Sequence, residues 1–116
     1  MKCALLVPAW SPEEIFSSRT AGSQINYWQP LGTLYVASSL IAAGHNVKFL
    51  NGAFMTNYEI MDSLESWRPD AVGLYSTAFG WDKACLAALQ IKELIPEVFV
   101  FAGGPYLVAT GASALK

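Results

Sequence analysis

The residues best suited to hold a ligand directly follow two short apolar runs. Ser76 and Thr77 follow one run, and Gly103, Gly104 and Pro105 follow the other, with 26 residues between Ser76 and Gly103. Hydroxyl and backbone N–H groups can bond the polar parts of a ligand, and glycines let a ligand approach the backbone closely. Either set by itself is equally typical of a helix cap or a tight turn. The prediction of a binding site therefore depends on the elements that position these residues.

Residues for catalysis or metal binding form no recognisable pattern. The two cysteines, Cys3 and Cys85, occur in no CxxC or CxxxCxxC motif, so they cannot build a zinc or iron–sulfur site. Both are predicted to be free, buried thiols in a reducing compartment. The single histidine, His45, follows Gly44 in what we expect to be a solvated turn. The sequence therefore predicts no catalytic residues and no metal ligands in this chain.

Short apolar segments alternate with amphipathic segments along the sequence. The strands are expected at residues 2–7, 47–50, 71–75 and 98–102. Helices are expected from Pro30, from the capping-box sequence Thr56–Glu59, and from Trp81. Because connections between parallel strands are right-handed, this order predicts one parallel sheet with helices on both faces. The expected fold is α/β, a flavodoxin-like (Rossmann-like) doubly wound sheet.

A ligand is expected at one edge of this sheet. Open parallel sheets bind ligands at the carboxyl ends of their strands, where the strand order reverses. For the order 2-1-3-4-5, that point lies between the first and third strands, whose following loops begin at Pro8 and Ser76. Gly103 ends the neighbouring strand at the same edge. We therefore expect Ser76 and Gly103 to meet at a ligand site.

The last apolar run, residues 98–102, lacks the charge or proline that discourages pairing at the edge of a sheet. This composition predicts an interior strand whose neighbour lies beyond Lys116. We expect residues 1–116 to form one domain that stops before a fifth strand and its helix.

Four segments of the chain resemble the B12-binding domains found at the N-terminus of cobalamin-dependent radical SAM enzymes. Residues 30–37 (PLGTLYVA) resemble the PLGLLYLA signature, and residues 42–47 (AAGHNV) resemble AGHEV. Residues 69–74 (PDAVGL) resemble PDVVGIS, and residues 103–105 (GGP) resemble GGPH. The segments come in the order of the family and cover nearly the whole chain.

The wider cobalamin-binding family carries the motifs SxL and GG in this part of the fold. Ser76 and the glycine pair 103–104 have the spacing of those motifs, and Ala78 stands where the family has leucine. The resemblance implies that the nucleotide tail of cobalamin enters a gap lined by Ser76, Thr77, Gly103 and Gly104, with Ala78 and Pro105 beside them.

A third family motif, DxHxxG, precedes SxL. Placing Gly32 at its glycine puts Tyr27 at the aspartate and Gln29 at the histidine, which ligates cobalt in the classical proteins. A glutamine amide is a poor ligand by comparison. The resemblance therefore implies base-off cobalamin with no protein histidine on cobalt, and with Tyr27, Trp28 and Gln29 under the corrin.

The resemblance also implies a parent enzyme that this chain does not contain. In such an enzyme a radical SAM domain, with a 4Fe–4S cluster and S-adenosylmethionine, performs methyl transfer or related radical chemistry. The expected partners are cobalamin and the radical SAM domain of the same parent chain. This chain is the binding module, without a complete catalytic site.

Composition and charge narrow the other possibilities. The net charge of −2 gives no basic field for nucleic acid or an anionic membrane. The two charge-free stretches, 20–44 and 98–115, are interrupted by glycine, proline and amides, so neither is expected to be a transmembrane helix. No signal-peptide pattern is present. The expected location is therefore the cytoplasm. Two alternatives stay open. One is a flavodoxin-like module for another ligand such as FMN, and the other is an interaction domain that has lost its ligand.

Overall fold

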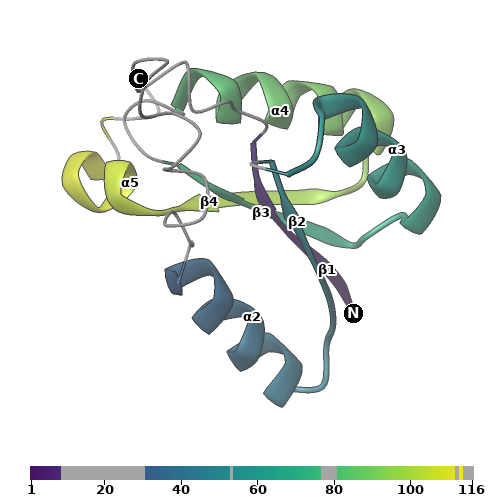
Figure 1. Cartoon of the computed structure of the whole chain (residues 1–116), viewed down its shortest axis with the longest axis horizontal. Helices are drawn as coiled ribbons and strands as arrows, with labels where there is room; N and C mark the ends of the chain where they lie inside the picture. The colour runs from purple at the N-terminus through teal and green to yellow at the C-terminus, as the bar shows by residue number, and fades with distance from the viewer. Residues whose placement is uncertain (9–30, 53, 77–80, 112, 114–116) are drawn as a thin grey trace.

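The apolar run near the N-terminus forms a central strand of a parallel sheet. The computed structural model describes residues 1–8, 31–52, 54–76, 81–111 and 113, and within them the sheet has the strand order β2-β1-β3-β4 (Figure 1). The strands are β1 (Lys2–Val7), β2 (Asn46–Asn51), β3 (Ala71–Tyr75) and β4 (Phe99–Gly103), and the helices are α2 (Leu31–Ala42), α3 (Asn57–Trp67), α4 (Trp81–Leu94) and α5 (Pro105–Thr110). All three strand pairings are parallel. The predicted flavodoxin-like α/β fold is confirmed.

Alternate residues of β1 face the two layers of helices, as expected for a strand buried on both sides. Ala4 and Leu6 belong to the larger core cluster, which α3 and α4 complete with Ile60, Leu64 and Ile91. Figure 1 shows these two helices together on one face of the sheet.

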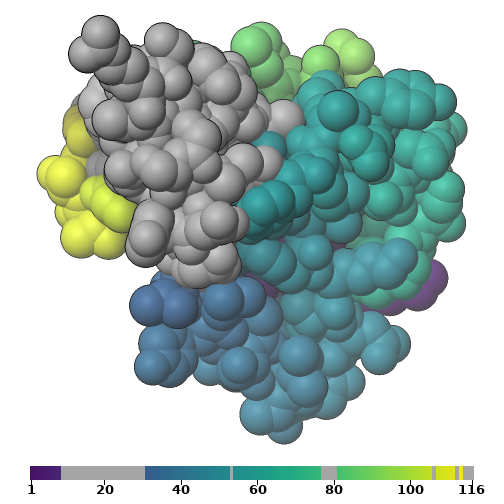
Figure 2. Space-filling model, in the orientation of Figure 1, coloured from purple at the N-terminus to yellow at the C-terminus, as the bar shows by residue number. Residues whose placement is uncertain are grey.

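The opposite face of the sheet carries a smaller core cluster. Among the residues that the structure describes, its buried members are Cys3, Leu5, Ala37 and Ala71. Within α2 only Ala37 is fully buried, and the helix forms the outer surface at the bottom of Figure 2. Burial raises the pKa of the Cys3 thiol, because an apolar environment disfavours the thiolate.

The capping box predicted at the start of α3 is present. The Glu59 backbone N–H donates to Thr56 Oγ1 at 3.1 Å, and the Thr56 N–H donates to Glu59 Oε1 at 3.2 Å.

We expect Thr56→Ala to cost about 1 kcal/mol of unfolding free energy, or roughly 4–8 °C in the thermal midpoint. Thr56→Ser keeps the acceptor oxygen and is the control. A serine variant that melts as early as the alanine variant would contradict this role.

The buried face of helix α4 does not include Cys85. Ala84, Ala87 and Ile91 are its buried residues, whereas Cys85 is exposed. The prediction that both cysteines are buried is therefore right for Cys3 and wrong for Cys85.

Strand β4 lies at the edge of the sheet in the described residues. Its first residue, Phe99, is 64% exposed and stacks on Phe101 with ring centroids 6.1 Å apart. Its composition is that of an interior strand, and a further neighbour for it stays a prediction. None of the helices in the described part of the chain is long and apolar enough to span a membrane.

Candidate functional site

The carboxyl ends of β3 and β4 are joined at the residues that the sequence singles out. The Ser76 backbone N–H donates to the Gly103 carbonyl oxygen at 2.9 Å. The next residue, Gly104, has φ 118° and ψ 180° and begins α5. A Cβ atom at Gly104 would lie 2.6 Å from the Ser76 carbonyl oxygen. Ser76, Gly103 and Gly104 therefore meet as predicted, and this contact requires glycine at 104.

The two glycines of the pair have different surroundings. A Cβ atom at Gly103 would meet nothing within 4 Å, and the same is true at Gly32 in the first turn of α2. The Ser76 side chain, by contrast, is only 1% exposed. Open space beside Gly103 and Gly32 leaves room for a ligand to approach the backbone.

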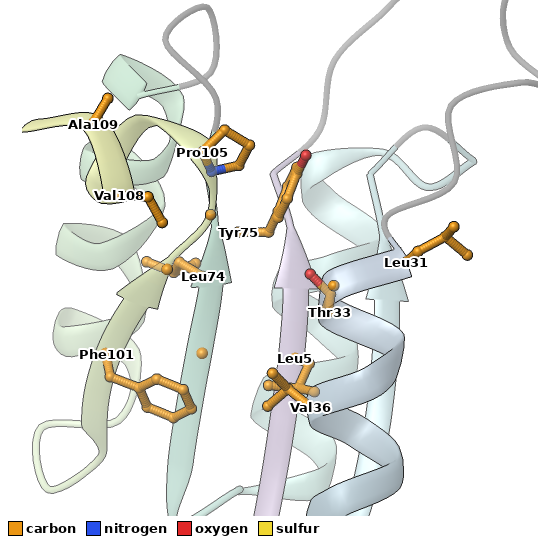
Figure 3. Close-up of a pocket in the computed structure, with 14 residues that line it drawn as sticks. Leu5, Leu31, Thr33, Val36, Leu74, Tyr75, Phe101, Pro105, Val108 and Ala109 are labelled. Atoms are coloured by element: carbon orange, nitrogen blue, oxygen red, sulfur yellow. The ribbon is translucent and has the colours of Figure 1, made fainter.

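A cavity of about 630 Å³ lies between α2 and α5, over β1, β3 and β4 (Figure 3). Four of the predicted site residues line it, namely Gly32, Gly103, Gly104 and Pro105. The other lining residues are Leu5, Leu31, Thr33, Val36, Gly73, Leu74, Tyr75, Phe101, Val108 and Ala109. Sequence reasoning missed this second set, although the alternation of residues along β1, β3 and β4 could have indicated which of them share a face of the sheet.

Gly73 forms part of the sheet surface under this cavity. A Cβ atom at Gly73 would lie 2.6 Å from Phe101 Cζ and 2.8 Å from Leu5 Cδ2. The Phe101 ring therefore occupies the space that a side chain at residue 73 would need. Because residue 73 is glycine, the Phe101 ring can lie against the sheet and does not fill more of the cavity.

The remaining predicted site residues, Tyr27, Trp28, Gln29, Thr77 and Ala78, lie outside the described residues. Their roles stay predictions. Within the described residues, no three His, Cys, Asp or Glu side chains gather where they could hold a metal ion.

The single histidine lies at the opposite end of the sheet from the cavity. His45 directly precedes β2, and its Nδ1 lies 3.4 Å from the N-terminal amine of Met1. Both residues are at the amino ends of strands, whereas the cavity adjoins the carboxyl ends. Because the sequence holds no second histidine, the chain has no imidazole to offer to a metal at the cavity.

The fold and the cavity are those of a flavodoxin-like module with a candidate small-molecule site at the carboxyl edge of its sheet. Residues 21–116 match the model of the B12-binding domain family, and the chain belongs to this family. No solved structure gives a significant match.

Two curated relatives are similar to the chain. An uncharacterized methyltransferase of Pyrococcus horikoshii is 31% identical over 112 residues, which make up 95% of this chain and 23% of the relative. The hopanoid C-3 methylase of Methylococcus capsulatus is 32% identical over 78 residues, which make up 66% of this chain and 15% of the methylase. The chain thus spans less than a quarter of the length of either relative.

Proposed function

We propose that residues 1–116 are the cobalamin-binding module of a radical SAM enzyme, with the nucleotide tail of cobalamin in the cavity between α2 and α5. The observation that supports this most directly is the cavity itself, which opens at the edge where ligands bind in such sheets. Its volume of about 630 Å³ lies within the usual range for small-molecule sites. Membership of the B12-binding family identifies the ligand class.

The residues around the cavity fit the tail of this cofactor. Gly32 and Gly103 leave open space at their Cα atoms, so the tail can lie against the backbone there. Gly104 and Pro105 form the wall at the start of α5. Ser76 joins β3 to Gly103 through its backbone N–H, and its buried side chain is not part of the cavity lining. Contacts of Thr77 and Ala78 with the tail, and of Tyr27, Trp28 and Gln29 with the corrin, are part of the proposal.

The proposed state of the cofactor is base-off, with no histidine on cobalt. His45 is remote from the cavity, and Gln29 stands where the family motif has its histidine. The tail cannot ligate cobalt while its base occupies the cavity. When bound, cobalamin supplies a cobalt ion able to carry a methyl group, and this chain binds and orients the cofactor.

The reaction itself is proposed to belong to another domain of the parent chain. The names of the two relatives, a methyltransferase and a methylase, support methyl transfer. A radical SAM domain with a 4Fe–4S cluster and S-adenosylmethionine is the proposed partner, working in the cytoplasm. The small share of the relatives that this chain covers leaves ample length for such a domain.

Titration of the purified chain with hydroxocobalamin, followed by gel filtration and visible spectroscopy, tests this function. We expect retained cobalamin with a base-off spectrum, and the same spectrum with the His45→Ala variant. A base-on spectrum would contradict the placement of the tail, and a spectrum that changes in His45→Ala would contradict the absence of a histidine ligand. Retention of FMN in place of cobalamin would favour the flavin alternative.

A further inference from the structure

The side chains that line the cavity change in polarity with depth. Figure 3 shows the hydroxyl groups of Thr33 and Tyr75 toward the carboxyl ends of the strands, where Leu31, Pro105 and Val108 also lie. Leu5, Val36 and Phe101 lie further down the strands and helix α2. Among the described lining residues, none is charged, and Thr33 and Tyr75 carry the only polar side-chain groups. The mouth of the cavity therefore has two hydroxyl groups among apolar side chains, and the described side chains at its floor are hydrocarbon.

The backbone of the floor also offers little hydrogen-bonding capacity. Gly73 is the register partner of Leu5 on one side and of Phe101 on the other. Strand β3 lies between β1 and β4, so its N–H and C=O groups are used in the sheet ladder. A polar atom of a ligand that reached this depth would lose its hydrogen bonds to water and find no described partner.

We propose that this cavity selects among corrinoids by the base of their nucleotide tail, taking an apolar base such as dimethylbenzimidazole and disfavouring adenine. The proposal rests on the proposed cobalamin function and names the corrinoid class that the site accepts. Dimethylbenzimidazole presents two methyl groups and a hydrocarbon ring edge to the floor. Adenine presents an exocyclic amine and additional ring nitrogens, and burying such groups unpaired is costly. The ribose and phosphate of either tail remain near the hydroxyl groups at the mouth.

The test compares three corrinoids by equilibrium binding to the same protein. They are cobalamin, the corresponding cobamide with adenine as its base, and cobinamide, which lacks the nucleotide. We expect cobalamin to bind roughly tenfold to a hundredfold more tightly than the adenine cobamide, from the usual cost of an unpaired buried polar group. Equal affinities, or tighter binding of the adenine form, would overturn the selectivity while leaving the proposed function intact. Failure of all three to bind would refute the proposed function and this inference with it.

A variant of a lining residue on α2 tests whether the selectivity comes from the apolar lining of the cavity. Val36→Asn places an amide on α2 at a position that is 45% exposed and lines the cavity. We expect the ratio of the affinity for cobalamin to the affinity for the adenine cobamide to fall by about fivefold or more in this variant, because the amide can form a hydrogen bond with adenine. Ile41→Asn is the matched control, since Ile41 is on the same helix, 58% exposed and away from the cavity lining. Equal changes of the preference in both variants would show that the apolar lining of the cavity does not set it.

Discussion

Replacing Gly104 with alanine is expected to lower the thermal unfolding midpoint by about 10 °C or more, from a backbone strain of roughly 1–3 kcal/mol with a steric clash added to it. Gly104 has φ 118° and ψ 180°, a conformation that is essentially restricted to glycine. Its Cβ atom would lie 2.6 Å from the Ser76 carbonyl oxygen and 3.0 Å from the Ser76 nitrogen. Both are backbone atoms at the end of a sheet strand, so they cannot move aside cheaply.

Gly103→Ala is the matched control for this variant. A Cβ atom there meets nothing within 4 Å, so we expect the midpoint to change by about 4 °C at most. The same variant is expected to bind cobalamin more weakly, because the added methyl group enters the space beside the cavity wall. Differential scanning fluorimetry of the two variants gives the comparison. Equal midpoints for the two variants would show that the close contact between Gly104 and Ser76 does not determine the stability of the fold.

The parts of this site that depend on topology could be predicted from the sequence. Strands buried on both faces appear as plain apolar runs, so β1 and β3 were predicted at residues 2–7 and 71–75, where the structure has them. Once the sheet is parallel, residues that follow neighbouring strands share an edge. The meeting of Ser76 with Gly103 and Gly104 follows from that rule alone.

The cavity itself could not be predicted in the same way. Leu5 and Phe101 look like ordinary core residues in the sequence, since nothing local reveals that a cavity lies over them. That depends on the separation of α2 and α5, which is a property of the tertiary packing. The requirement for glycine at residue 73 could not be predicted for the same reason. It depends on the position of the Phe101 ring, which is distant in the sequence.

Alanine at residue 73 is expected to weaken cobalamin binding by about tenfold, a difference of about 1.4 kcal/mol. The new methyl group would lie 2.6 Å from Phe101 Cζ and 2.8 Å from Leu5 Cδ2. Relief of such overpacking typically involves 1–3 kcal/mol of strain. The Phe101 ring lines the cavity, so a displacement away from the sheet would carry it into the space proposed for the tail. A tail that enters must then displace the ring again.

Two comparisons separate this effect from a general loss of stability. Cobinamide, which has no nucleotide to place in the cavity, is expected to bind Gly73→Ala and the unchanged protein equally. The double variant Gly73→Ala with Phe101→Leu removes the ring atoms that clash, so it is expected to regain most of the cobalamin affinity, as coupled neighbours do in a double-mutant cycle. If cobinamide binding falls as far as cobalamin binding, Gly73 acts through the stability of the sheet. If cobalamin binding alone falls and the double variant recovers it, the Phe101 ring sets the depth to which the nucleotide tail can enter.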